Sequence, residues 1–363
     1  MTETKEELLK KIKEDYNSYT AFEVQQFLIE NKISESELLK AVDGDMEIVE
    51  AIKRYSNPIL ESNTNQIPDK IKDYCTEIFF WGLGSAGKTW ALSGILSTIY
   101  IEGHFKSYGN TTSENCISPE YLNGLLNVIN NRKPINYLPD KTTNDTIRYM
   151  NFKLLKDGKE RKVAFIDLAG DVVKAIAKEN IIKGHNDLKR ERDLLENILN
   201  NKNRKIHFFF IDYNRDIDYD RAEKGNAVEH QQRNYFTNLC AIFNSKGYFK
   251  KNTDFIYIVI TKADMMDCAE NQRRNKAIKY FKDNYASFRN NLGKICQDNE
   301  INSDSDKNEG DYSFLDDYVR DFSIGDVLFL RMCRFKKKFS EEIVNIIFER
   351  VPEERTGIFS IFG

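Results

Sequence analysis

The stretch Ile78-Phe79-Phe80-Trp81-Gly82-Leu83-Gly84-Ser85-Ala86-Gly87-Lys88-Thr89 decides the fold of this chain of 363 residues. An apolar run that predicts a strand leads into the pattern G-x-x-x-x-G-K-[ST], and helix-forming residues follow it. Glycines let backbone N–H groups approach phosphate oxygens, and the first turn of a helix directs its positive end at the same point. The stretch predicts a phosphate-binding loop, and a glycine-rich turn without a ligand is the alternative.

Two side chains of this loop add a charge and a metal ligand. Lys88 supplies a point charge for the β- and γ-phosphates, and the Thr89 hydroxyl is placed to ligate Mg²⁺, which keeps most of its waters. The predicted phosphate contacts are Gly82, Gly84, Ser85, Ala86, Gly87, Lys88 and Thr89.

A second motif, D-x-x-G, ends the apolar run Val163-Ala164-Phe165-Ile166-Asp167-Leu168-Ala169-Gly170. A carboxylate at the carboxyl end of a strand beside the phosphate loop can hold Mg²⁺, often through water. The backbone N–H of Gly170 can then contact the γ-phosphate. D-x-x-G is a common strand end by itself, so this assignment depends on its pairing with the phosphate loop.

A third motif, T-K-x-D, ends the apolar run Ile258-Val259-Ile260-Thr261-Lys262-Ala263-Asp264. The carboxylate of Asp264 can accept from both N1–H and N2–H₂ of guanine, a pair of donors that adenine lacks. The stem of Lys262 can cover one face of the base. An ordinary charged strand end is the alternative.

With these three motifs in order, the chain resembles the TRAFAC class of P-loop GTPases, which includes Ras-like proteins and translation-factor G domains. The resemblance covers residues from about 75 to 350 and implies GTP/GDP and Mg²⁺ binding, a Ras-like sheet and nucleotide-dependent switch loops. It carries Asp167 and Gly170 to the metal and γ-phosphate side, and Thr261, Lys262 and Asp264 to guanine. Thr261 departs from the commoner Asn.

The resemblance also implies a threonine in a first switch loop, over Mg²⁺ and the γ-phosphate. Thr142 or Thr143 is the choice for this metal-binding and catalytic role, and Thr146 is the alternative. A further family loop touches guanine O6, and Ser323 in Phe322-Ser323-Ile324-Gly325 fits its position, although the usual Ala-Lys pair is missing.

Asp171 follows Gly170, where many relatives have a Gln or His that orients the attacking water. An ionised Asp171 cannot donate a hydrogen bond, and its charge would lie near the γ-phosphate. We therefore expect slow intrinsic hydrolysis, with Lys88, Thr142, Thr143, Gly170 and Asp171 as the catalytic candidates. Arg132 is a possible arginine finger, although a solvated loop charge is the commoner role.

Strand and helix patterns alternate after residue 70, and the longest apolar runs indicate strands buried on both faces. We predict an α/β fold, a mostly parallel P-loop sheet flanked by helices. The expected strands are 77–81, 146–155, 162–166, 205–211, 254–260 and 317–322, and the expected helices 88–100, 118–130, 187–201, 227–244, 271–297 and 339–351. Residues 214–226 are expected to be a surface excursion, and 299–313 a mobile polar loop.

The predicted domains are a helical interaction module (1–60), a linker (61–74), the P-loop GTPase domain with insertions (75–351) and an apolar tail (352–363). The module carries capping boxes at Thr20 and Ser34 and is net acidic. A small helical domain before an enlarged G domain resembles bacterial GTPases of multi-component conflict or signalling loci.

Composition limits the class of protein. The net charge of −3 does not favour nucleic acid as a partner, and no apolar run is long enough for a transmembrane helix. The scattered cysteines and the charged first twenty residues suit a cytoplasmic protein. We expect a GTP-hydrolysing switch coupled to a protein partner or a second copy. The alternatives are an ATPase, or a pseudo-GTPase scaffold that binds nucleotide without turnover.

Overall fold

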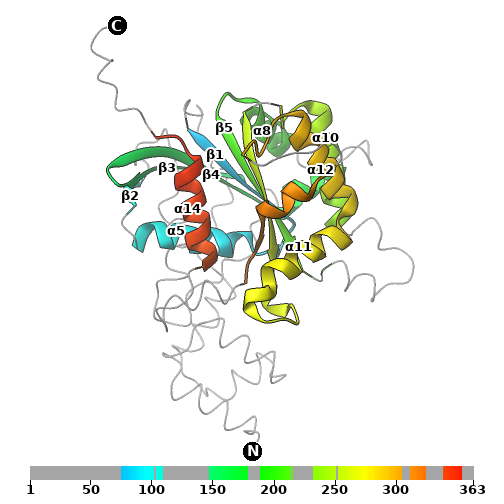
Figure 1. Ribbon diagram of the computed structural model, residues 1–363. Helices are drawn as coiled ribbons and strands as arrows, with labels where there is room; N and C mark the ends of the chain where they lie inside the picture. The colour runs from blue at the N-terminus through cyan, green and yellow to red at the C-terminus, as the bar shows by residue number, and fades with distance from the viewer. Residues whose placement is uncertain are drawn as a thin grey trace, which may run out of the picture. The chain divides into compact units, whose positions relative to one another are not determined.

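One seven-stranded sheet organises the part of the chain that the computed structural model describes, in the order β2-β3-β4-β1-β5-β6-β7 (Figure 1). The described residues are 75–101, 104–108, 147–178, 189–213, 215, 232–250, 252–304, 311–323 and 338–353. The strands are β1 (Thr76–Trp81), β2 (Phe105–Tyr108), β3 (Ile147–Lys156), β4 (Lys159–Leu168), β5 (Arg204–Asp212), β6 (Thr253–Thr261) and β7 (Val319–Asp321). The five strands from β4 to β7 in this order are parallel, and β2 and β3 pair antiparallel at one edge.

Helices cover both faces of the sheet (Figure 1). They are α5 (Lys88–Ile101), α7 (Gly170–Lys178), α8 (Lys189–Asn200), α10 (Gln232–Lys246), α11 (Arg273–Asn284), α12 (Ala286–Asp298) and α14 (Lys338–Arg350). Helix α5 packs on α14, whereas α10 packs on α7 and α12. The predicted α/β fold with a mostly parallel sheet is therefore confirmed. The predicted module and linker (1–74), the helix at 118–130 and most of the tail lie outside the described residues.

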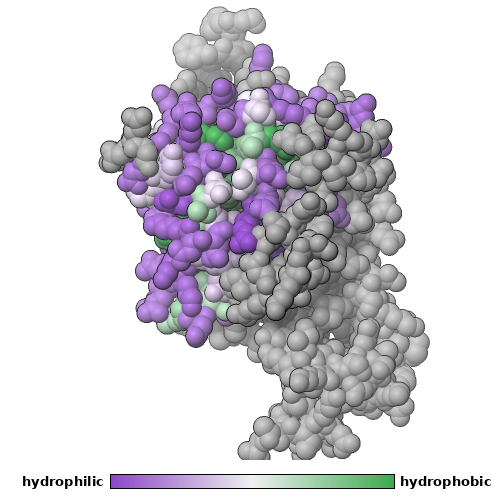
Figure 2. All heavy atoms as spheres, turned by 90° about the vertical axis from the view of Figure 1, so that its right-hand side faces the viewer, coloured by the Kyte–Doolittle hydropathy of each residue, from purple (hydrophilic) through white to green (hydrophobic). Residues whose placement is uncertain are grey.

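The central strands are buried on both faces, as their apolar runs predict. Every residue of β1 is buried, and Phe80 stacks on Phe208 of β5 with ring centroids 5.9 Å apart. On the face shown in Figure 2 the described surface is mostly hydrophilic, so the helices there direct their apolar sides inward. A sheet enclosed in this way is a rigid frame for the loops at the carboxyl ends of its strands.

The β3–β4 hairpin turns at Asp157-Gly158. Both residues have positive φ, 53° and 74°, as the tight two-residue turns of hairpins require. Pairing outward from this turn places Arg148 of β3 opposite Asp167 of β4.

The structure corrects two expected elements and adds two that were not expected. The single helix expected over 271–297 is two helices, α11 and α12, because Tyr285 leaves helical geometry and its buried hydroxyl accepts a hydrogen bond from Gln232 Nε2 at 2.8 Å. The strand expected over 317–322 is shorter and follows a 3₁₀ turn, Ser313–Tyr318. Helix α7 and strand β2 were not expected at all.

The polar stretch 299–313 was expected to be a loop, and its described part contains a buried anchor. The side chain of Asn302 accepts from Ile256 N at 2.9 Å and donates to Ile256 O at 3.2 Å. Ile256 lies before the segment of β6 that pairs with β7, so Asn302 takes the place of a neighbouring strand there.

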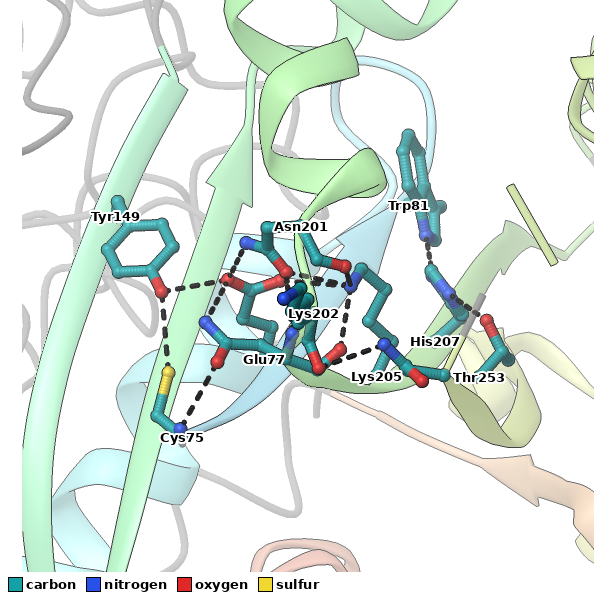
Figure 3. Close-up of polar contacts among 11 residues, drawn as sticks. Cys75, Glu77, Trp81, Tyr149, Asn201, Lys202, Lys205, His207 and Thr253 are labelled. Carbon is teal, nitrogen blue, oxygen red and sulfur yellow. Dashed lines mark hydrogen bonds and ion pairs between the residues drawn. The ribbon is translucent and has the colours of Figure 1, made fainter. Parts of the chain in front are cut away.

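A buried polar cluster lies at the end of the sheet where β1 and β5 begin, and Figure 3 shows its contacts. Glu77 accepts hydrogen bonds from Tyr149 (2.9 Å), Asn201 (2.5 Å) and Asn203 (3.0 Å). Lys205 lies 3.6 Å from Glu77, and both side chains are inaccessible to solvent. Burial raises the pKa of Glu77, against the opposing effect of the Lys205 charge, and burial lowers that of Lys205. The cluster fastens the turn after α8 to the start of β1.

Next to this cluster, Trp81 at the end of β1 donates from its indole Nε1 to His207 Nδ1 at 2.9 Å (Figure 3). Burial lowers the pKa of His207 to about 3, so the ring is neutral. Because Nδ1 is the acceptor, the proton is on Nε2, which donates to Thr253 Oγ1 at 3.3 Å.

Candidate functional site

The predicted phosphate loop connects β1 to α5, and two of its glycines are required by the structure. A Cβ on Gly82 would lie 2.9 Å from the carbonyl oxygen of Phe210 on β5, and Gly87 has a φ of +78°. A Cβ on Gly84, by contrast, would meet no atom of a described residue within 4 Å, so packing among these residues does not require glycine there. The two tryptophans of the chain, Trp81 and Trp90, flank this loop.

Lys88 lies at the start of α5 and folds back onto the loop. Its ammonium donates to the carbonyl oxygens of Gly82 at 2.7 Å and Leu83 at 3.1 Å. Burial lowers the pKa of Lys88 to about 8, and the nearby Asp167 carboxylate partly opposes this effect. Lys88 is thus a buried cation held at the mouth of the loop by carbonyl groups.

We expect nucleotide affinity to fall as the pH rises above about 8, the value to which burial lowers the pKa of Lys88. A bound phosphate chain raises this pKa again, so binding above that pH takes up a proton, and the dissociation constant rises by up to about tenfold per pH unit. Titration of GTP between about pH 7 and pH 9 measures this slope. Lys88→Arg is the control, because its charge persists throughout, and an equal slope in both proteins would contradict the assignment.

Asp167 ends β4 beside the phosphate loop, where the sequence places it. It is fully buried, and its carboxylate lies 3.7 Å from the Arg148 guanidinium on β3. The carboxylate of the buried Asp167 and the hydroxyl of the half-buried Thr89 are hard oxygen donors, which fit Mg²⁺. The guanidinium of Arg148 would compete with that ion for the carboxylate of Asp167.

Gly170 lies directly against the phosphate loop. A Cβ on Gly170 would be 2.0 Å from the backbone nitrogen of Gly84, so only glycine fits. Helix α7 begins at this residue, and the carboxylate of Asp171 in its first turn accepts from Lys174 Nζ at 2.6 Å. Asp171 is therefore neutralised locally by an ion pair that the sequence analysis missed.

The T-K-x-D residues reach the same edge of the sheet. Thr261 lies 3.7 Å from where a Cβ on Gly87 would be, and Lys262 has a φ of 55° and pairs with Asp212 Oδ2 at 2.8 Å. Asp264 is exposed just beyond them.

The loop that carries Ser323 is tied to this turn, since Ala263 N donates to Phe322 O at 3.0 Å. Ser323 is buried beside it. The structure therefore brings the third motif and the predicted O6 loop together.

Four expected residues lie outside the described residues, the switch candidates Thr142 and Thr143, their alternative Thr146, and the finger candidate Arg132. Of the surface excursion expected over 214–226 the structure describes Arg215 alone, whose guanidinium donates to Gly84 O at 2.7 Å, a contact that the sequence analysis missed. Sequence reasoning also missed Gln232, which is fully buried. Its amide oxygen accepts from Asp212 N, and its amide nitrogen donates to Asp212 O. Neither residue belongs to a local motif.

Comparisons with known proteins found no matching family model and no matching curated protein. Among solved structures, a nucleolar GTP-binding protein 1 from Plasmodium falciparum has 12% sequence identity and a TM-score of 0.30, over 78% of this chain and 90% of that one. The GTP-bound Ski7 GTPase-like domain of S. cerevisiae has 13% identity and a TM-score of 0.35, over 77% of this chain and 51% of that one. GDP-bound Roco2 RocCORdC from Methanosarcina barkeri has 14% identity and a TM-score of 0.29, over 79% and 53%.

This chain thus spans about half the length of the Ski7 and Roco chains. At these TM-scores we draw nothing about function from the likeness. Among the described residues, no helix has both the length and the apolar character needed to cross a membrane.

Proposed function

We propose that the chain is a GTP-binding and GTP-hydrolysing switch. One observation carries the proposal, namely that the three motifs meet at one edge of the sheet. Gly170 and Thr261 both lie against the phosphate loop, from either side of β1 in the strand order. Ligands of open α/β sheets bind at this edge, outside the carboxyl ends of the strands.

Each group at this edge has a role in the proposed reaction. Lys88 and the loop N–H groups bind the phosphates, and the Gly170 N–H contacts the γ-phosphate. Thr89 and Asp167 would hold Mg²⁺, with Thr142 or Thr143 as the proposed switch ligand. Bound there, the ion would neutralise charge on the β- and γ-phosphates. Asp264 would select guanine, with Ser323 beside it.

Replacing Asp264 with asparagine tests the base assignment. The amide presents a donor where guanine N2–H₂ also donates, whereas xanthine carries a carbonyl oxygen there. We expect GTP affinity to fall by roughly 10- to 100-fold and xanthosine triphosphate to become the better ligand. Competition among GTP, ATP and xanthosine triphosphate measures this, with Asp267→Asn, an exposed carboxylate three residues along, as the matched control.

Two outcomes would change the proposal. An unchanged preference for GTP in the Asp264 variant would place base recognition elsewhere. A wild-type preference for ATP would favour the ATPase alternative.

The Asp171–Lys174 ion pair favours a second candidate, a scaffold that binds nucleotide without turning it over. Its carboxylate has no donor for an attacking water, and Lys174 already occupies one of its oxygens. The charges of both residues act on Lys88, so the pair lies near the phosphate site.

We expect Asp171→Gln to raise the rate of GTP hydrolysis, because a neutral amide both donates to and accepts from water. The gain appears in the single-turnover rate rather than in affinity, since the group acts on the transition state. Asp193→Gln, an exposed substitution on α8, is the control. If GTP binds tightly and neither wild type nor Asp171→Gln hydrolyses it, the scaffold is the better description.

We also propose that the N-terminal module couples the nucleotide state to a protein partner or a second copy. The sequence of residues 1–60 contains none of the nucleotide motifs and is net acidic. These features suit a docking module rather than a part of the nucleotide site.

A further inference from the structure

One described arginine outside all three motifs, Arg215, contacts the phosphate loop. The Nη1–H of Arg215 donates to the carbonyl oxygen of Gly84 at 2.7 Å. The two residues are 131 positions apart in the chain, so the fold and not the local sequence brings them together. Arg215 is half-buried.

The neighbouring strand delivers Arg215 to this place. Strand β5 runs parallel to β1, with Trp81 opposite Phe209, so the end of β5 lies beside the phosphate loop. The chain is fastened just before the arginine, because Tyr213 N donates to Thr261 O at 3.2 Å and Asp212 pairs with Lys262. The position of Arg215 is therefore set by the same strand end that fixes the T-K-x-D turn.

The positive charges around the phosphate loop favour the binding of an anion. The charges of Arg215 and Lys174 both reach Lys88, and each acts to lower its pKa. Among the described residues, the carboxylates of Asp167 and Asp171 act on Lys88 in the opposite direction. Asp167 also lies beside Arg148, and Asp171 is paired with Lys174. A bound phosphate chain would relieve the repulsion between Arg215 and Lys88.

The guanidinium has the capacity to bind that anion. It carries five N–H donors in a planar fork that matches phosphate oxygens, and the contact with Gly84 uses one nitrogen. No atom of a described residue lies within 4 Å of a Cβ placed on Gly84. A phosphate lying over Gly84 is thus accessible to Arg215 without displacement of any other described side chain at that point.

We propose that Arg215 binds the terminal phosphate of the bound nucleoside triphosphate and stabilises the charge that develops on it during hydrolysis. The inference rests on the proposed function and supplies a residue that none of the three motifs contains. In the reaction, the oxygen of water forms a bond to the γ-phosphorus while the bond from that phosphorus to the β–γ bridging oxygen breaks. The products are GDP and inorganic phosphate, which receives the proton of the attacking water. Arg215 acts on the γ-phosphate oxygens and takes no proton.

The test compares diphosphate with triphosphate binding. GDP and a non-hydrolysable GTP analogue are titrated into wild type, Arg215→Ala and Arg215→Lys, with Arg190→Ala on the exposed side of α8 as the control. We expect Arg215→Ala to lose roughly 10- to 100-fold in affinity for the triphosphate analogue and less than about threefold for GDP. Arg215→Lys keeps the charge without the fork and should fall between the two.

Turnover gives a second readout. We expect the single-turnover rate of GTP hydrolysis to fall roughly a thousandfold in Arg215→Ala and to stay unchanged in Arg190→Ala. Thermal unfolding of each variant, without nucleotide, checks that the fold is retained. If Arg215→Ala does not fold, Arg215→Lys carries the comparison, and a loss confined to the triphosphate analogue supports the inference.

Other outcomes overturn the inference. Equal losses of affinity for both nucleotides would mean that Arg215 only holds the Gly84 carbonyl in place. Equal affinities in all variants would mean that Arg215 does not contact the ligand.

Failure of the proposed function gives a different result, which is seen in the wild-type protein. If wild type prefers ATP, the same titrations with ADP and a non-hydrolysable ATP analogue test Arg215. If wild type binds no nucleotide, tripolyphosphate and pyrophosphate replace them, and equal affinity of wild type and Arg215→Ala for tripolyphosphate rejects the inference.

Discussion

Replacing Lys88 with alanine is expected to lower GTP affinity by about a hundredfold or more. Charged hydrogen bonds contribute roughly 1.5–3 kcal/mol each, and the ammonium of Lys88 would form at least one to each of two phosphates. The variant should unfold at the same temperature as wild type or at a higher one. The lowered pKa of Lys88 is the sign that its burial opposes the charged form, and alanine removes that buried charge.

Titration of GTP and a thermal unfolding curve, both on the same preparation, check the two parts of this expectation. Lys189→Ala is the control, because Lys189 is an exposed cation at the start of α8, outside the phosphate loop and its partners. An affinity for GTP that survives Lys88→Ala within about threefold would remove the phosphate-loop assignment.

Replacing Lys205 with methionine is expected to lower the free energy of unfolding by about 3–5 kcal/mol. The methionine keeps most of the side-chain volume and removes the charge. Glu77 would remain fully buried without its cation, and three oxygen acceptors of Asn201 and Asn203 would lose a donor. Urea unfolding of wild type and variant measures the difference.

Two further proteins separate a lost ion pair from a general packing defect. The double variant Glu77→Gln/Lys205→Met should recover part of the loss, because a glutamine oxygen still accepts from Tyr149 without carrying a charge. Lys153→Met removes an exposed cation that lies 3.8 Å from the half-buried Glu160, and should change stability by less than about 1 kcal/mol. Equal effects of Lys153→Met and Lys205→Met would mean that the Glu77–Lys205 pair is not a special feature of the core.

The motifs could be located from the sequence because each ends an apolar run. Parallel strands place their carboxyl ends at one edge, so Lys88, Asp167 and Thr261 had to come close once the sheet was predicted. The Arg148–Asp167 pair can also be predicted from the sequence, since counting residues outward from the turn at Asp157-Gly158 places these two residues opposite each other. The position of the turn in the sequence is therefore enough to predict that Arg148 lies opposite Asp167.

Arg215 and the break at Tyr285 could not be predicted in the same way. Arg215 lies in a polar segment whose composition resembles that of any surface loop, and its partner is a backbone carbonyl, which leaves no pattern in the sequence. Tyr285 interrupts a continuous helical pattern because its hydroxyl bonds to Gln232, a residue far away in the chain. Both features depend on tertiary contacts that override local preference.

The positions of the two tryptophans give the protein an optical signal of its own. Trp81 is fully buried with its indole N–H held by His207, so its emission should stay constant when ligands are added. Trp90 follows Thr89 directly and is half-buried, so its emission should respond to metal ion and nucleotide. The tryptophan fluorescence of the whole chain therefore originates at the two borders of the phosphate loop. Binding and release can be followed in stopped flow with unlabelled nucleotide, and Trp90→Phe leaves Trp81 as an internal reference.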